Sequence, residues 1–146
     1  MRALVQRVSE ASVIANGSLT GEIGRGLVVL VGIKTGDTAD RAERLAHKIA
    51  GLRIFPDESG RMNRSLVEIG GELLVVSQFT LYADTHKGNR PSYAAAAPAQ
   101  AAEPVYEHFV QCCADRGLRV ATGVFQADMQ VRLVNDGPVT VICEID

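Results

Sequence analysis

The sequence predicts a single α/β (α+β) domain, residues 1–146, in which a curled, barrel-like mixed β-sheet packs against two helices. Two stretches with helical periodicity lie among roughly seven or eight apolar runs that are rich in β-branched residues. The first of these runs are short and separated by turn residues, which favours a curled sheet over a doubly wound one. The chain contains no GxGxxG or Walker-type loop, so the usual nucleotide-binding folds are not indicated.

The N-terminal part of the chain is typical of β-structure. Turn residues stand at Asn16-Gly17 and at Gly24-Arg25-Gly26, between runs in which apolar and polar residues mix on both faces. The run "GLVVLVGI" at 26–33 is continuously apolar. Such a run indicates a central strand that is covered on both sides.

Residues 37–52 are predicted to form the first helix. Apolar side chains recur at intervals of three and four, and charged side chains occupy the other face. The apolar positions are Ala42, Leu45, Ala46, Ile49 and Leu52. Asp37 or Thr38 supplies the N-cap, and Gly51 stands near the end of the helix.

The middle of the chain contains a short strand, a glycine-containing loop and a second central strand, "ELLVVSQF", at 72–79. A long irregular stretch follows at 85–100, and a loop of this length in a compact domain is often functional. The second helix is predicted at 103–117, with Pro104 in its first turn and Gly117 at its end. Its apolar side is formed by Val105, Phe109, Cys112 and Cys113.

Two final strands are predicted at 124–136 and 138–146. The segment Asn135-Asp136-Gly137-Pro138 lies between them. Taken alone, this segment predicts a turn, because Asn, Asp and Gly tolerate turn conformations and proline removes a backbone donor where a strand should begin.

Length and composition limit the classes of function. The chain has 146 residues, of which 47% are hydrophobic and 22% charged, as in ordinary soluble domains. Its net charge of −2 argues against gripping long nucleic acid through many phosphates, so a nucleic-acid partner must be held locally. No apolar run is long enough to span a membrane, and "MRALVQRVSEASV" predicts a strand rather than a signal peptide. These features predict a cytoplasmic protein.

The cysteines indicate neither a disulfide framework nor a metal centre. There are three, Cys112, Cys113 and Cys143, and their spacing does not fit zinc. His108 and Cys112 stand four residues apart on the second helix without further ligands, so we expect no metal site and no cofactor.

Polar side chains at the end of the second central strand form the candidate site. Ser77, Gln78 and Thr80 end this apolar run, and Lys87 and Arg90 follow in the loop. One interpretation is a strand end with a solvated basic loop. The functional interpretation is a pocket with hydroxyl, amide and backbone donors, plus cations for a phosphate or carboxylate. Thr80 as a nucleophile would need a base, and His86 is the only histidine nearby.

Several segments resemble the D-aminoacyl-tRNA deacylase (D-tyrosyl-tRNA(Tyr) deacylase) family over essentially the whole chain. They are "SQFTL" at 77–81, "ADT..G.RPS" at 83–92 and "NDGPVT" at 135–140, with "QRV..ASV" at 6–13. The resemblance implies a hydrolase that cleaves the ester of D-aminoacyl-tRNA to free D-amino acid and tRNA, as chiral proofreading in translation quality control. It also implies a homodimer with active sites at the subunit interface, and no metal or cofactor.

The same resemblance implies roles for individual residues. Ser77, Gln78, Phe79 and Thr80 would form the catalytic pocket, with the Phe79 and Thr80 backbone amides as oxyanion donors. Gly137-Pro138, joined by a cis peptide bond, would enter the partner's pocket and select chirality.

Further residues would support binding. Met129 would wall the adenine site, Arg7 would hold the partner's Gly-Pro loop, and Lys87 and Arg90 would contact tRNA phosphates. Because glycine has no side chain to exclude, glycyl-tRNA should also be cleaved, and the enzyme should be broad among D-amino acids.

Two alternatives remain open. The first is a non-catalytic module that binds a nucleic-acid 3′ end through the same pocket, which tRNA binding without deacylation would favour. The second is a hydrolase of small D-amino esters or amides that uses Thr80 as its nucleophile.

Overall fold

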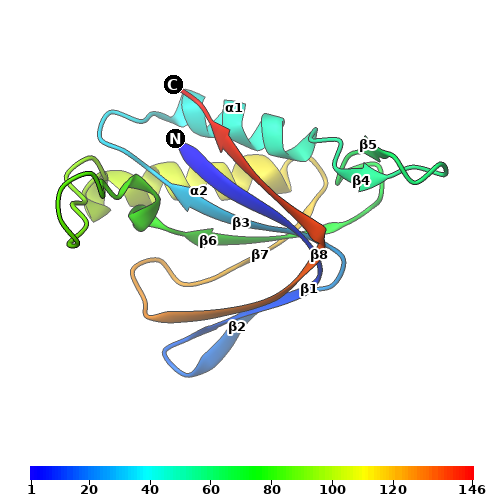
Figure 1. Ribbon diagram of the computed structural model, residues 1–146, viewed down its shortest axis with the longest axis horizontal. Helices are drawn as coiled ribbons and strands as arrows, with labels where there is room; N and C mark the ends of the chain where they lie inside the picture. Colours follow the sequence, from blue (N-terminus) through cyan, green and yellow to red (C-terminus); the bar gives the residue numbers. More distant parts are fainter.

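The protein is a curled mixed β-sheet with two helices packed against one of its faces (Figure 1), as described by a computed structural model of residues 1–146. The helices are α1 (Ala39–Ala50) and α2 (Ala99–Ala114), and a short 3₁₀-helix, η1, covers Phe79–Tyr82. The strands are β1 (Arg2–Ala15), β2 (Ser18–Ile23), β3 (Gly26–Gly32), β4 (Phe55–Pro56), β5 (Met62–Arg64), β6 (Glu72–Ser77), β7 (Arg119–Thr122) and β8 (Met129–Glu144). Neither helix is both long and apolar enough to cross a membrane.

Strand β1 organises the main sheet because it pairs with three other strands. Its first half, from Arg2 to Val8, is antiparallel to β3, and its second half, from Ala11, is antiparallel to β2. Strand β8 runs antiparallel along the other edge of β1 over nearly its full length. The change of partner along one strand bends the sheet, so β1 is long where the sequence predicted short strands.

Two parallel pairs extend the sheet to its other end and curl it toward closure. The order is β2-β1-β3-β6-β7, with β3 parallel to β6 and β6 parallel to β7. The end strands then approach each other, since a Cβ atom added at Gly21 of β2 would lie 2.8 Å from the Thr122 carbonyl oxygen of β7. The predicted barrel-like mixed sheet is therefore confirmed.

The two faces of the curl bury separate apolar clusters. The larger cluster lies between the sheet and the helices, with Phe55 and Phe109 fully buried. The smaller cluster fills the inside of the curl and consists of Val8, Ala11, Val13, Ile23, Val28, Leu74 and Val76. Strand β1 supplies side chains to both clusters, which explains why neither of its faces is cleanly polar in the sequence.

The N-terminus of α2 departs from the sequence prediction, whereas the N-cap of α1 is one of the two residues predicted. Helix α2 begins at Ala99 after the N-cap Pro98, so Pro104 lies inside it rather than in its first turn. The alanine-rich residues before Pro104 have high helix propensity, which extends the helix backward. Thr38 is the N-cap of α1 but makes no capping hydrogen bond with its side chain. The Asp37 carboxylate instead accepts hydrogen bonds from Lys34 N at 2.8 Å and from the Met1 ammonium at 2.9 Å.

The C-terminal strands also differ from the prediction. Strand β7 was not predicted, and it is only four residues long and half-buried for most of its length. Residues 124–128, predicted as strand, form a turn-rich connection instead. The two predicted final strands are one strand, β8, that continues through Gly137 and Pro138.

Candidate functional site

A cavity of about 530 Å³ opens at the C-terminal end of β6. Its walls come from that strand end, from the connection between β7 and β8, and from the first turn of α2. Ten of its 14 lining residues are hydrophobic, so it suits a flat apolar group such as a nucleobase better than a bare phosphate. The structure brings Ser77, Gln78, Phe79 and Met129 together in this wall, whereas Thr80 is not part of the lining.

The 3₁₀-helix η1 presents backbone donors at the edge of this cavity. The first N–H groups of a helix have no acceptor within it, and those of Phe79 and Thr80 have none among the turn, loop and cap hydrogen bonds. Gln78 is fixed just before them, since its N–H donates to the Val31 carbonyl at 2.8 Å. Two adjacent free amides at the edge of an apolar cavity can stabilise a developing oxyanion.

The hydroxyl of Thr80 lacks an activating base. It accepts a hydrogen bond from the Gln78 side-chain amide. The ring of His86 is 93% exposed, and its Nδ1 lies 2.6 Å from the Asp84 carboxylate. The backbone N–H of His86 also donates to this carboxylate and, with the ring, lowers the pKa of Asp84 below its usual value. His86 and Thr80 therefore have different partners.

Lys87 and Arg90 lie on the exposed loop that follows η1. The loop is closed at its base by two backbone hydrogen bonds between Asp84 and Ser92, of 2.7 and 2.9 Å. Neither Lys87 nor Arg90 takes part in an ion pair, so both cations face solvent. The loop and η1 lie at the same end of the molecule as the first turn of α2 (Figure 1).

Gly137 and Pro138 lie in a bulge of β8, not in a hairpin turn. Between the pairs Gln6–Thr140 and Val8–Asn135, β1 advances by two residues while β8 advances by five. The three additional residues project from the ladder, and Gly137 and Pro138 are exposed and joined by a cis peptide bond. We call residues 136–139 the Gly-Pro bulge. The turn predicted from these residues alone is wrong, because strand pairing with β1 resumes on both sides.

Arg7 and Asn135 hold the Gly-Pro bulge of their own chain, whereas Arg7 was expected to hold the loop of the partner. Arg7 donates from Nε to the Asp136 carbonyl at 3.1 Å and from Nη1 to the Ile54 carbonyl at 2.6 Å. A Cβ atom at Gly137 would lie 2.8 Å from Arg7 Nη2, so the guanidinium packs directly against this glycine. The Asn135 amide donates to the carbonyls of Arg7 and Val139, both at 2.9 Å. These contacts fix the direction of the bulge backbone.

The Gly-Pro bulge does not border the cavity of its own chain, since none of its residues belongs to the lining. Arg7 pairs with Leu27, and Leu27 pairs with Leu73, whereas the part of the same strand that lines the cavity is Val76 and Ser77. Val76 lies three residues beyond Leu73, a distance of about 10 Å along the strand at about 3.3 Å per residue. The Gly-Pro bulge and the cavity are therefore separated along the sheet.

Some residues of the cavity carried no signal in the sequence. Phe125, Gln126 and Asp128 line it from the β7–β8 connection, where Gln126 adopts a positive φ of 63°. Tyr106 of α2 packs against Phe125 and donates to the Val75 carbonyl, and burial raises the pKa of its phenol to about 12. An isolated Gln in the left-handed region is not detectable from residue type, because Gln rarely adopts it.

Comparison with known proteins identifies close relatives. The family model for D-Tyr-tRNA(Tyr) deacylase matches residues 4–144. A D-aminoacyl-tRNA deacylase of Cereibacter sphaeroides is 59% identical over 99% of both chains. That of Anaeromyxobacter dehalogenans is 56% identical over 99% of this chain and 97% of its own length.

Two solved structures share the fold. The c-Myc DNA unwinding element binding protein superposes with a TM-score of 0.93 at 42% identity, over 100% of this chain and 99% of its own. A probable eukaryotic D-amino acid tRNA deacylase superposes with a TM-score of 0.86 over 99% of this chain and 98% of its own. At 18% identity, the second comparison supports the fold alone.

Proposed function

The chain belongs to the D-Tyr-tRNA(Tyr) deacylase family, and we propose that it hydrolyses the ester joining a D-amino acid to the 3′-terminal adenosine of tRNA. The observation that carries the proposal is the family match over residues 4–144, which includes the strand end that opens onto the cavity. The products would be free D-amino acid and tRNA, so the reaction would serve chiral proofreading in translation.

The chemistry requires little from side chains. An aminoacyl ester is already activated, and the neighbouring ribose 2′-OH can assist the attack or position water. The protein then supplies orientation and oxyanion stabilisation, for which the Phe79 and Thr80 amides at the cavity edge are suited. Met129 and the other apolar lining residues would hold the adenine. The exposed ring of His86 makes no hydrogen bond with Thr80, which is compatible with a mechanism that does not use this histidine as a general base.

Selection of D over L would come from the Gly-Pro bulge of a partner subunit. A backbone carbonyl placed where an L side chain would point excludes all L substrates by overlap. Glycine permits this close approach, and Arg7 and Asn135 hold the bulge rigid. The exposed bulge does not line the cavity of its own chain, which supports a homodimer with each active site at the subunit interface.

The rest of the tRNA would need few contacts. Lys87 and Arg90 have no acidic partner and lie on the loop after η1, so they can approach phosphates near the 3′ end. A net charge of −2 is compatible with such local binding. A protein that acts on aminoacyl-tRNA would work in the cytoplasm, as the sequence predicts.

Incubation with matched D-, L- and glycyl-tRNAs tests the proposed function. We expect rapid cleavage of esters with several different D-amino acids, cleavage of glycyl-tRNA, and no detectable cleavage of the L esters. Equal rates for D and L would contradict the selection mechanism. Tight tRNA binding without release of any amino acid would contradict the enzymatic function and favour a 3′-end binding module.

Replacing Thr80 with Ala separates backbone catalysis from a Thr80 nucleophile. The substitution keeps the backbone amide and removes the hydroxyl that accepts from Gln78, together with the γ-methyl group. We expect kcat for D-aminoacyl-tRNA to fall by no more than about 10-fold, because the oxyanion donors remain. Single-turnover kinetics measure this value. A fall of about 10⁶-fold, typical of nucleophile removal, would favour the hydrolase that attacks through Thr80.

A further inference from the structure

The 3₁₀-helix η1 is too short to fix its own orientation. It holds four residues and is closed by hydrogen bonds from Leu81 N to Gln78 O at 3.2 Å and from Ala83 N to Thr80 O at 3.1 Å. Hydrogen bonds of this type have poorer geometry than those of an α-helix, and such helices form only short pieces. The direction of the Phe79 and Thr80 amides therefore depends on what η1 packs against.

One side of η1 packs against the end of β3 without any free space. A Cβ atom added at Gly32 would lie 3.0 Å from the Leu81 Cβ and 3.2 Å from the Gln78 carbonyl oxygen. It would also lie 3.2 Å from the Tyr82 ring. Backbone of β3 thus packs closely against the helix, and a side chain next to Gly32 can add to this support.

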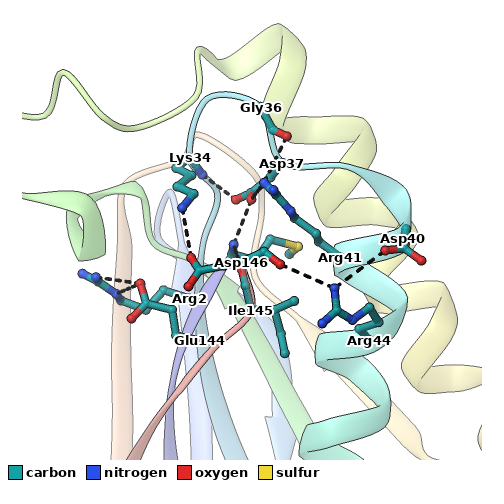
Figure 2. Close-up of polar contacts among 11 residues, drawn as sticks. Arg2, Lys34, Gly36, Asp37, Asp40, Arg41, Arg44, Glu144, Ile145 and Asp146 are labelled. Atoms are coloured by element: carbon teal, nitrogen blue, oxygen red, sulfur yellow. Dashed lines mark hydrogen bonds and ion pairs between the residues drawn. The ribbon is translucent and has the colours of Figure 1, made fainter.

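Arg2 is the antiparallel partner of Gly32 in β1 and makes a second contact with η1 beside that of β3. Its Nη1 donates to the Leu81 carbonyl at 2.8 Å, and its guanidinium carbon lies 4.9 Å from the centroid of the Tyr82 ring. The same side chain donates from Nε and Nη2 to one Glu144 carboxylate oxygen at 3.1 and 2.8 Å (Figure 2). Arg2 thus ties the last turn of η1 to the β1–β8 pair.

The ends of the chain hold Arg2 in place. Arg2 and Glu144 are direct partners in the antiparallel register of β1 and β8. The Met1 ammonium is fully buried and donates to Asp37 at 2.9 Å and to the Ile145 carbonyl at 2.8 Å (Figure 2). A long, flexible side chain is thereby attached to a fixed backbone and given a fixed acceptor.

We propose that Arg2 is a positioning residue for deacylation, which orients η1 so that the Phe79 and Thr80 amides meet the oxyanion. The proposal rests on the proposed function, because it assigns Arg2 a task in that reaction. Arg2 touches neither the cavity nor the Gly-Pro bulge, so it should affect the rate of ester cleavage and leave the choice between D and L unchanged.

The test compares Arg2→Ala with Lys34→Ala. Lys34 pairs with Asp146 at 3.2 Å in the same cluster of chain ends and makes no hydrogen bond to η1, so its removal controls for the loss of a terminal ion pair. For Arg2→Ala we expect kcat for D-aminoacyl-tRNA to fall about 10- to 100-fold, since misplaced oxyanion donors lose most of their effect. KM should change by less than about 3-fold, because adenine and phosphate contacts remain.

Two further variants separate positioning from general destabilisation. Glu144→Gln keeps Arg2 but weakens its anchor, and we expect a smaller fall in kcat in the same direction. Tyr82→Phe keeps the ring beneath the guanidinium and removes a buried hydroxyl without a partner, so kcat should stay at the wild-type value. All rates are measured well below the melting temperature of each variant. An unchanged kcat in Arg2→Ala, or one that follows only its unfolded fraction, would overturn the proposal.

Hydrogen exchange tests the positioning independently of activity. In Arg2→Ala the Leu81 and Ala83 amides should exchange faster than in the wild type, whereas Lys34→Ala should match the wild type. If the wild-type protein did not cleave D-aminoacyl-tRNA, the proposed function would fail, and faster exchange would still support contact of Arg2 with η1. Unchanged exchange in Arg2→Ala, together with active wild-type protein, would refute positioning alone.

Discussion

Replacing Gly137 with Ala is expected to lower the ratio of D- to L-aminoacyl-tRNA cleavage on the order of 100-fold, while the protein remains folded. A shift of about 1 Å at a positioned group can change rates by this factor. The added Cβ would lie 2.8 Å from Arg7 Nη2 and 2.9 Å from Val139 Cγ2, and the φ of +127° strains alanine, so the Arg7 guanidinium must shift away from the bulge that it holds. We expect the carbonyl that is proposed to exclude L substrates to shift with it. Parallel assays with both esters measure the ratio.

Gly17→Ala is the matched control for this prediction. Gly17 has a φ of +83° and Gly137 a φ of +127°, so alanine is strained at both positions. Nothing lies within 4 Å of a Cβ at Gly17, whereas Arg7 and Val139 crowd Gly137. We expect both variants to lose roughly 1–3 kcal/mol of stability from backbone strain. Only Gly137→Ala should change the D-to-L ratio, and an equal ratio in the two variants would refute the steric role of the bulge.

A mixed dimer shows which subunit's bulge acts on which cavity. One subunit of the proposed dimer carries Gly137→Ala, and the other carries an inactivating change at the η1 amides. A different tag on each subunit allows the mixed dimer to be isolated. If the bulge acts on the partner, the only competent cavity faces an intact Gly137, and selectivity for D is that of the wild type. If the bulge acted within its own chain, that cavity would face the altered residue, and the ratio would equal that of Gly137→Ala.

Local pattern predicted the central strands well because burial alone decides them. The continuous apolar run at 26–33 and the run at 72–79 became β3 and β6, adjacent and parallel under the helices. Both helices were predicted for a similar reason, since their buried positions recur at three and four. The predicted start of α2 was wrong because the helix propensity of residues 99–103 outweighs the preference of proline for the first turn of a helix.

Long-range pairing decided the features that the sequence could not predict. The β8 strand continues through Asn135 and Pro138 because β1, more than 120 residues earlier, accepts it on both sides of the bulge. The residue types at this place correctly predict that the chain leaves regular strand geometry. They do not show that only three additional residues leave the β1–β8 ladder before pairing resumes. The cavity likewise assembles from strand, helix and connection, and Phe125 and Gln126 gain their position only there. The resemblance of short motifs located Ser77, Gln78 and Phe79, which composition alone left as a polar strand end.

Replacing Phe79 with Pro is expected to lower kcat for D-aminoacyl-tRNA about 10²- to 10³-fold, the effect of losing one oxyanion donor. Proline removes the Phe79 N–H but suits the first position of a helix, where that N–H has no helical acceptor. The preceding residue, Gln78, has φ −142° and ψ 78°, outside the α region that proline disfavours there. The backbone can therefore remain while its donor is lost.

Phe79→Ala is the comparison that isolates the N–H. The Phe79 ring is 55% exposed and stacks edge-on with Tyr93 at 5.2 Å, and both substitutions remove it. Alanine keeps the amide, so any fall in kcat that the alanine and proline variants share is caused by loss of the ring. Rapid-quench measurement of ester cleavage, with melting curves for both variants, compares them under identical conditions. A proline variant as active as the alanine variant would mean that the Phe79 amide does not stabilise the oxyanion. The Thr80 amide would then have to stabilise it alone.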